Sequence, residues 1–370
     1  MKVFILIVLI LYSFIFSLPG SEAEMDRYII SMDIHDYKSY LASNIPLDEL
    51  YFIENRVYFL VGKKDVAKIQ RETIKSLVKI QPELFVSPLS GRKGGVNGLY
   101  HNYAETEAAL FDLADRFPNL ATVFSVGQSI EGREIYVIKI SDNVELEEDE
   151  PNIFIVGCHH AREWISVEIP LLFTRHLLEH YSDTSEVQKI VDGAQLYIMP
   201  IQNPDGLEYS IHHYRYWRKN RRYNGNFSWG VDPNRNYGYM WGYSDMGSSP
   251  DPNSEVYRGP SPFSEPENVA VRDFLLAHPP AGTLSYHNFS QLILFPWGYI
   301  DELTPDDEEM RAIAQNMSEL IYQVNGRTYR YGTGPEILYP SNGGTVDWVY
   351  GTFGTPAYTI ELPNETFFLG

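Results

Sequence analysis

Two histidines, an arginine and a glutamate lie within a short polar stretch of the segment GCHHAREWIS, residues 157–166. The pattern H-x-x-E occurs here as His160 and Glu163, and again further along as His176 and Glu179. Residues three apart in a first helical turn can point to one spot, and an imidazole with a carboxylate suits Zn²⁺. Because the pattern occurs twice, it is weak evidence alone, and a solvated turn remains an alternative.

Position in the chain separates the two copies of this pattern. His160 and Glu163 directly follow the apolar run NIFIVGC, which predicts a strand, whereas His176 and Glu179 fall inside a predicted helix over 165–181. Functional groups of open α/β sheets gather just beyond the carboxyl ends of strands. We therefore expect a surface or packing role for the second pair. A catalytic zinc has three protein ligands, and His287, after the predicted strand GTLSY, is the best third one.

Arginine is concentrated in one segment, residues 214–237, of an otherwise acidic chain. One interpretation is a solvated basic loop that a turn at Asp232-Pro233-Asn234 closes. The other is a receptor for a carboxylate or oxyanion, because guanidinium groups match these bidentately. Zinc beside such a receptor favours hydrolysis of a substrate that carries a free carboxylate. The arginines are Arg215, Arg218, Arg221, Arg222 and Arg235.

Helices and strands alternate from residue 99 onward, which predicts an α/β fold with a mixed central sheet covered by helices on both faces. Helices are predicted over 105–118, 165–181 and 306–324, and strands over 121–126, 134–140, 152–158, 195–200, 282–286 and 356–362. Three polar segments follow strands of this set: CHHARE, HNFS, and the end of AYTIE, which carries Glu361.

The first hundred residues differ from the rest of the chain. Lys2 and an apolar run from Val3 to Phe16 predict a signal peptide over 1–23, since the run is shorter than the ~20 residues of a membrane-spanning helix. Short apolar runs, and an apolar helical face over 65–80, predict a small α+β unit next. The Gly- and Ser-rich segment 87–98 contains Arg92-Lys93. A plain linker and a proteolytic activation site fit its composition equally well.

Composition limits the classes of partner. The net charge of −20 argues against nucleic acid and anionic membranes. The single cysteine, Cys158, allows no intrachain disulfide and excludes Cys-x-x-Cys zinc and redox sites. We expect a secreted monomer.

At this point the chain resembles a known family, the zinc metallocarboxypeptidases of the carboxypeptidase A/B type. The resemblance covers residues 99–370 and rests on seven ordered segments: SIEGREIYVIKIS, HAREWIS, YRYWRKNR, VDPNRNY, SYHNFSQLILFPWGY, LYPSNGGTVDWVYG and YTIEL. It implies an activation domain over 24–91, a linker over 92–98 that a trypsin-like protease cleaves, and a catalytic domain over 99–370. It also implies one Zn²⁺ per chain and peptide or protein substrates with a free C-terminus.

The resemblance implies a role for each matching residue. His160, Glu163 and His287 match the zinc ligands, and Glu361 matches the general base that takes a proton from the attacking water on the zinc. Arg218 matches the group that stabilises the oxyanion. The remaining matches are Asn234, Arg235 and Tyr339 as the clamp on the terminal carboxylate, Arg162 and Arg215 as supporting groups along the cleft, and Asp232 as the carboxylate that orients His160.

Specificity depends on Val346, at a family position that is apolar in the A type and acidic in the B type. An apolar side chain there favours aliphatic or aromatic C-terminal residues, although nearby Glu336 keeps a basic preference open. Two departures from the family stand out. Phe289 replaces a usual tyrosine, and the chain ends nine residues after Glu361, where the family continues into a long helix. We therefore expect a C-terminally truncated catalytic domain.

Two other functions remain open. A non-catalytic peptide-binding protein could use the same scaffold, although such relatives usually lose a ligand or the base. A zinc hydrolase for small acyl-amino acids would need a closed pocket instead of a long cleft.

Overall fold

The computed structural model describes residues 27–33, 50–53, 56–62, 76–79 and 100–363. The chain divides into two units, Met1–Lys93 with His213–Arg215, and Gly94–His212 with Tyr216–Gly370. The predicted signal peptide, the cleavage site at Arg92-Lys93 and the last seven residues lie outside the described parts of the chain. The domain boundaries and the expectation about the C-terminal end therefore stay predictions.

The first unit contains an antiparallel sheet with the strand order β2-β3-β1-β4. Its strands are β1 (Arg27–Asp33), β2 (Leu50–Ile53), β3 (Arg56–Gly62) and β4 (Ser76–Lys79). The predicted helix over 65–80 is wrong at its C-terminal end, because Leu77 and Val78 lie on β4. Their backbones pair with those of Ile30 and Ile29 on β1, and this strand pairing overrides the helical spacing of the sequence.

The second unit is built on an eight-stranded mixed sheet with the order β13-β12-β14-β11-β7-β8-β6-β5. The central strand β11 pairs in parallel with β7 on one side and with β14 on the other, while β6 and β5 add antiparallel pairs at one edge. The strands are β5 (Ala121–Gln128), β6 (Glu134–Ile140), β7 (Asn152–Val156), β8 (Gln195–Met199), β11 (Gly282–Asn288), β12 (Leu292–Phe295), β13 (Arg330–Thr333) and β14 (Ala357–Leu362).

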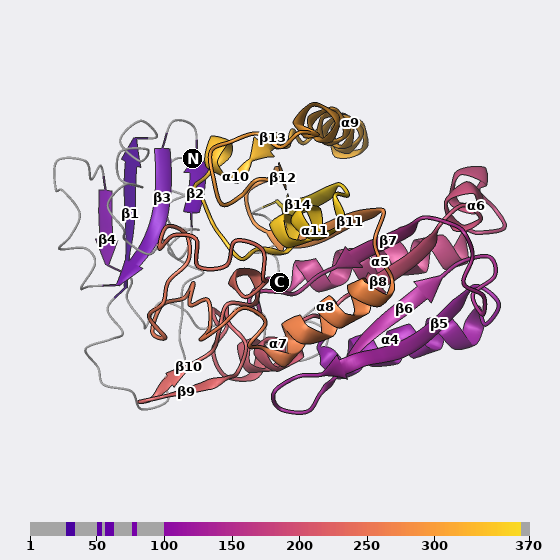
Figure 1. The fold of residues 1–370 in the computed structure, drawn as a ribbon, viewed down its shortest axis with the longest axis horizontal. Helices are drawn as coiled ribbons and strands as arrows, with labels where there is room; N and C mark the ends of the chain where they lie inside the picture. The colour runs from indigo at the N-terminus through magenta and orange to yellow at the C-terminus, as the bar shows by residue number, and fades with distance from the viewer. Residues whose placement is uncertain (1–26, 34–49, 54–55, 63–75, 80–99, 364–370) are drawn as a thin grey trace. The chain divides into compact units, whose positions relative to one another are not determined.

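Helices cover both faces of this sheet, as predicted. In Figure 1, α8 lies in front of the strands, and α4 and α5 lie behind them. The helices are α4 (Tyr103–Arg116), α5 (Ile165–Glu179), α6 (Ser185–Val191), α7 (Pro204–His212), α8 (Pro266–Ala277), α9 (Asp307–Asn325), α10 (Gly334–Ile337) and α11 (Thr345–Phe353). A short 3₁₀ turn, η4 (Pro233–Arg235), and a hairpin of β9 (Tyr223–Gly225) and β10 (Ser228–Trp229) complete the unit.

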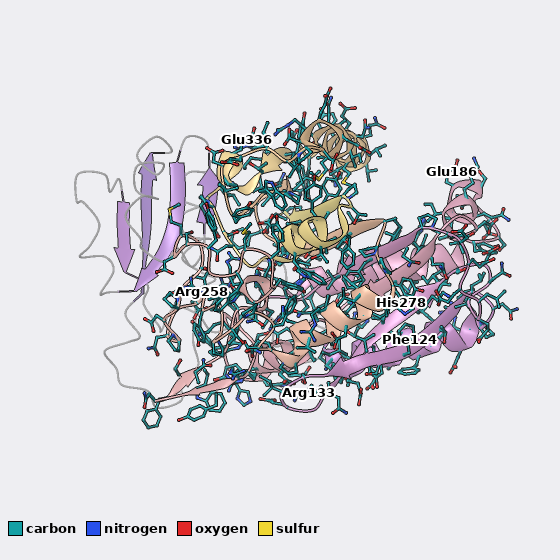
Figure 2. The ribbon with its side chains drawn as sticks, viewed as in Figure 1. Phe124, Arg133, Glu186, Arg258, His278 and Glu336 are labelled. Carbon is teal, nitrogen blue, oxygen red and sulfur yellow. The ribbon has the colours of Figure 1, made fainter. Side chains whose placement is uncertain are left out.

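Alternation along the strands supplies a separate core on each face. On β7, Ile155 packs into the cluster that contains residues of α4 and α5, whereas Phe154 and Val156 pack into the cluster under α8 and α11. Successive side chains of a strand point to opposite faces, so a sheet buried on both sides needs this continuous apolar run. Phe124 and His278, labelled in Figure 2, both contact the ring of Phe274 in the second cluster.

The sequence-based elements of the second unit agree with the structure to within a few residues, but several elements were not predicted. The missed ones are α6, α7, α8, α10, α11, β9, β10, β12, β13 and η4. Among the helices of the described ranges, none has the length and apolar character needed to cross a bilayer.

Candidate metal centre

A tight turn after β7 presents His160 and Glu163. Gly157 opens this turn, and a Cβ there would lie 2.0 Å from the carbonyl oxygen of Ser166, so only glycine fits. The backbone N–H of Cys158 donates to the Ser166 hydroxyl (3.0 Å), and that of Glu163 donates to the His160 carbonyl (3.1 Å). These contacts fold the turn back onto the start of α5, which directs both side chains to the sheet edge.

His287 reaches the same edge from the neighbouring strand. It lies near the end of β11, which pairs in parallel with β7. Its Nδ1 lies 3.0 Å from Glu163 Oε2, while His160 Nδ1 lies 2.7 Å from Glu163 Oε1. The two Nδ1 atoms are 3.1 Å apart. All three side chains are buried, so one imidazole pair and one carboxylate converge on a single point.

The chemistry of this donor set fits a zinc ion. Burial raises the pKa of Glu163, but the neighbouring His160 and His287 outweigh it and hold the pKa below its ordinary value. Burial lowers the pKa of His287, which favours its neutral form. Neutral imidazoles and an ionised carboxylate are common zinc ligands, and two ring nitrogens facing each other at 3.1 Å are well placed to share a cation.

Each histidine has a second polar neighbour at its other ring nitrogen. His160 Nε2 lies 3.3 Å from Asp232 Oδ1, a close electrostatic contact outside hydrogen-bond geometry. Ser285 Oγ lies 3.1 Å from His287 Nε2. Such neighbours orient the imidazole ring of a metal ligand and fix its tautomer. Ser285 was missed in the sequence, although its place two residues before His287 puts both side chains on one face of β11.

Arg218 and Asp232 form a buried ion pair beside these ligands. The Arg218 Nε and Nη2 atoms donate to Asp232 Oδ2 at 3.0 and 2.8 Å. The third guanidinium nitrogen, Nη1, lies 3.9 Å from Glu163 Oε1. Burial raises the pKa of Asp232, but Arg218 and His160 overcome it and hold the pKa well below its usual range. Asp232 therefore stays ionised and links the arginine to the histidine.

Glu361 lies on β14 and is the register partner of His287 in the parallel pair β11–β14. Burial, followed by the charge of Glu163, raises the pKa of Glu361 to about 8, while Arg218 and Arg235 act in the opposite direction. The structure thus brings a carboxyl group with a perturbed pKa to the edge that carries the converging ligands.

Asn234 and Arg235 lie in η4, which Asp232 caps by accepting from the Asn234 N–H at 2.9 Å. Asn234 Oδ1 accepts from the backbone N–H of Thr345 at 3.0 Å, which ties η4 to the start of α11. Arg235 donates from Nη1 to the Asn234 carbonyl at 2.7 Å and from Nε to the Gly247 carbonyl. These bonds hold the buried Arg235 side chain in a fixed position.

Two further candidates lie near this group. Burial lowers the pKa of Arg218, but the charges of Asp232 and Glu163 outweigh it and hold the pKa above its ordinary value; Tyr339 is close enough to interact with the arginine electrostatically. Val346 follows Thr345 on α11 and is half-buried against the second core cluster.

The structure does not bring every predicted arginine to the centre. Arg162 is buried, and its Nη1 reaches the Tyr216 carbonyl at 3.5 Å. Arg215 belongs to the first unit, so its assignment to the cleft stays a prediction. Arg221 stacks on Tyr209, with 3.6 Å from its guanidinium carbon to the ring centre, and Arg222 pairs with Glu265 at 3.0 Å. We therefore assign Arg221 and Arg222 a role in stabilising the fold.

The second H-x-x-E copy lies on α5, as expected. Glu179 forms a surface ion pair with Arg116 at 2.7 Å. The ring of His176 lies 4.7 Å from that of His180. His159, by contrast, was not singled out by the sequence although it is fully buried; its Nε2 lies 3.0 Å from Tyr237 Oη and 2.9 Å from Thr345 Oγ1. The ring of His159 stacks on that of His287, with 5.2 Å between the ring centres.

Carboxypeptidases are among the known proteins with similar sequences. Carboxypeptidase B of Astacus astacus is 38% identical over 268 residues, which cover 71% of this chain and 86% of that protein. Carboxypeptidase A4 of Mus musculus is 33% identical over 280 residues, which cover 75% of this chain and 66% of the mouse protein. This chain thus spans about two thirds of the length of the mouse relative.

Solved structures show the same fold. Carboxypeptidase A from Helicoverpa armigera aligns with a TM-score of 0.77 at 26% identity, covering 93% of this chain and 90% of that one. Bovine thrombin-activatable fibrinolysis inhibitor, in complex with tick carboxypeptidase inhibitor, aligns with a TM-score of 0.64 at 32% identity, covering 71% and 86%. A family model described as zinc carboxypeptidase matches residues 106–369. The predicted resemblance is confirmed, and the chain belongs to the zinc carboxypeptidase family.

Proposed function

We propose that the protein hydrolyses the C-terminal peptide bond of peptides, with one zinc ion held by His160, Glu163 and His287. The observation that carries this proposal is the convergence of these three buried side chains, whose ligand atoms all lie within 4.8 Å of one another. When bound, zinc supplies a Lewis acid that polarises the scissile carbonyl.

Glu361 acts as the general base. Its burial supports this role, because a carboxyl group whose pKa is raised toward neutral pH is a better proton acceptor than an ordinary one. Glu361 takes a proton from the attacking water and delivers it to the leaving amine. A cation in the neighbouring site would favour the ionised form that accepts the proton.

Arg218 stabilises the oxyanion that develops on the scissile carbonyl. Its guanidinium group is largely shielded from solvent and is held by two bonds to Asp232, so it needs no reorientation when the charge appears. Asp232 contributes by orienting both Arg218 and His160.

A second set of side chains binds the terminal carboxylate of the substrate. Arg235 supplies a guanidinium fork that its own backbone contacts hold in place, and Asn234 and Tyr339 complete the clamp. Arg162 and Arg215 support the cleft further along. Recognition of a free carboxylate restricts the enzyme to the end of a chain, which makes it an exopeptidase.

The side-chain pocket favours aliphatic or aromatic C-terminal residues, because Val346 offers no counter-charge to a substrate cation. The alternative basic preference depended on Glu336, but this residue pairs with Arg311 at 3.0 Å and is exposed. Asp347, the neighbour of Val346, is buried and accepts from the N–H groups of Gly298 and Tyr299 at 2.8 and 3.0 Å. Glu336 and Asp347 therefore already have partners within the protein, which argues against either one pairing with a basic C-terminal residue of the substrate.

We further propose that the enzyme is secreted as a monomeric zymogen. The activation domain over 24–91 would keep the enzyme inactive until a trypsin-like protease cleaves at Arg92-Lys93. Support comes from the apolar N-terminal run and from the separate first unit.

The test is amino-acid release from blocked dipeptides that end in Phe, Leu, Lys or Glu, measured before and after trypsin treatment. We expect release of Phe and Leu only after treatment. Glu361→Gln should keep one zinc per chain by elemental analysis but lose activity by about 10²–10⁴-fold. Glu302→Gln, a change of the same type at an exposed position, is the control.

Two outcomes would contradict this proposal. Near wild-type turnover by Glu361→Gln would remove its role as the base. Wild-type protein that holds zinc and releases no amino acid from any dipeptide would instead favour a non-catalytic peptide-binding protein.

A further inference from the structure

A buried histidine that the proposed mechanism does not use contacts neighbours of both the proposed metal ligands and the proposed carboxylate clamp. His159 lies in the turn after β7 and is fully shielded from solvent. Its Nδ1 lies 3.5 Å from Ser285 Oγ, and its Nε2 lies 2.9 Å from Thr345 Oγ1. Ser285 in turn contacts His287, and Thr345 contacts Asn234. One chain of polar contacts therefore runs from a proposed zinc ligand to a residue proposed to bind substrate.

The direction of the hydrogen bonds in this chain is fixed at its Asn234 end. The backbone N–H of Thr345 donates to Asn234 Oδ1 at 3.0 Å. The Thr345 hydroxyl lies 3.0 Å from the same oxygen, which can only accept, so the hydroxyl proton is directed to Asn234. The short contact between Thr345 Oγ1 and His159 then needs a proton on His159 Nε2. Tyr237 Oη lies 3.0 Å from the same nitrogen and is a second acceptor for this proton.

The same reasoning continues to the zinc end of the chain. Among the described residues, the ring nitrogens of His159 contact only hydroxyl groups, and a buried cation without a carboxylate partner is strongly unfavourable. The ring is therefore neutral, and its Nδ1 can only accept. The Ser285 proton is directed to this nitrogen, so Ser285 Oγ accepts from His287 Nε2 at 3.1 Å. A neutral His287 with its proton on Nε2 has a free Nδ1, which is the atom that lies 3.0 Å from Glu163 Oε2.

Both ends of the chain suit the proposed function. At the zinc end, the free Nδ1 of His287 presents its lone pair to the ion. At the other end, Thr345 occupies the side-chain oxygen of Asn234, so the amide NH₂ group is the part left to donate to a substrate carboxylate. The ring of His159 also stacks on that of His287, with an angle of 21° between the planes.

We propose that His159 is a positioning residue for the hydrolysis. Through Ser285 it holds His287 in the tautomer that binds zinc. Through Thr345 it holds the Asn234 amide in the orientation that binds a terminal carboxylate. This role rests on the proposed function, because His287 and Asn234 have the roles assigned there. It adds that zinc binding and carboxylate binding depend on one imidazole ring, whose protons are ordered by neighbours on both sides.

Zinc affinity and KM report the two ends of the chain separately. His159→Phe keeps an aromatic ring that can stack on His287 but removes both ring nitrogens. We expect zinc binding about tenfold weaker, measured on the full chain by competition with a chromophoric chelator. For a blocked dipeptide that ends in Phe, tested after trypsin treatment at saturating zinc, we expect a KM about tenfold higher and a kcat within about threefold of the wild type. The Asn234 contact contributes to binding of the substrate and not to the chemical step.

Variants on either side of His159 break the chain at one end only. Ser285→Ala should weaken zinc binding about tenfold and leave KM within about twofold of the wild type. Thr345→Val removes only the hydroxyl group, so it should raise KM about tenfold and leave zinc affinity within about twofold. His176→Phe, at an exposed position of α5, is the control for the substitution itself and should change neither quantity.

Two results would overturn the role of His159. The first is a His159→Phe variant whose zinc affinity and KM both stay within about twofold of the wild type. The second is an equal loss of both quantities in Ser285→Ala and in Thr345→Val, since that is the behaviour of a general structural role. If His159→Phe fails to fold, His159→Leu replaces it in the same comparison. If the wild type itself releases no amino acid, the proposed function fails, and the zinc affinities of His159→Phe and Ser285→Ala still decide whether His159 positions His287.

Discussion

Replacing Asp232 by Asn should weaken both zinc binding and folding, because one buried carboxylate serves three partners. Its Oδ2 accepts two bonds from Arg218, and its Oδ1 accepts from the Asn234 N–H and lies 3.3 Å from His160 Nε2. An amide has a single oxygen. If that oxygen faces Arg218, the amide NH₂ points at the Asn234 N–H and at the protonated Nε2 of a zinc-bound His160. Hydrogen-bond donors then face one another with no acceptor between them. If it faces His160, Arg218 loses the one oxygen that accepts both of its bonds.

The magnitude follows from the burial of this pair. Asp232 is fully buried, and the Arg218 side chain is 11% exposed. Breaking a buried pair while one charge remains costs about 3–5 kcal/mol, which lowers the Tm of a domain of this size by roughly 10 °C. Loss of a partner that orients a metal-binding histidine weakens zinc binding by about 10–100-fold.

Two measurements check this prediction independently of turnover. Competition with a chromophoric chelator gives the zinc affinity, and urea unfolding of zinc-loaded protein gives the free energy of unfolding. Asp301→Asn, at an exposed aspartate, is the control. Zinc affinity within twofold of the wild type, together with an unchanged free energy of unfolding, would refute the role assigned to Asp232.

Two further predictions concern specificity and pH. Val346→Asp should raise the ratio of kcat/KM for substrates ending in Arg to kcat/KM for substrates ending in Phe by roughly 100-fold, since a charge-assisted hydrogen bond contributes about 2–3 kcal/mol. An unchanged ratio would exclude Val346 from the pocket that binds the C-terminal side chain. Burial, with a smaller contribution from Glu265, raises the pKa of Glu267 to about 7. The folded protein therefore keeps a proton that the unfolded chain releases, and stability falls by up to about 3 kcal/mol as pH rises from about 4.3 to about 7. Glu267→Gln should flatten this part of the curve in urea unfolding at several pH values, and a curve of unchanged slope would contradict the assignment.

The elements with strong periodicity could be predicted from the sequence. The pattern of α9 continues over 19 residues with a clear apolar face, and β7 is an uninterrupted apolar run. The short elements α7, α11 and β12 carry too few residues for a period to be visible. The strand β4 was mistaken for a helix because its neighbours in the sheet, not its own spacing, determine its conformation.

The centre itself was only partly visible in the sequence. His160 and Glu163 form a local pattern, and strand-end positions drew attention to His287 and Glu361. The H-x-x-E pattern alone did not distinguish His160 and Glu163 from the copy on α5. Their position directly after a predicted strand did, and the motifs of the whole family supported the choice. Contacts between distant segments, such as Gln195 with the 142–150 loop, have no local signal at all.

The register of three parallel strands explains why these residues meet. His287 on β11 lies opposite Glu361 on β14, and β7 on the other side ends where the turn to His160 begins. A slip of one residue would turn His287 to the opposite face of the sheet. Ser285 Oγ, one pleat earlier on the same face, lies 3.1 Å from the His287 ring. The sheet therefore fixes the spacing between His287 and Glu361, a proposed ligand and the proposed base, while the residues proposed to bind the substrate lie mainly outside its strands.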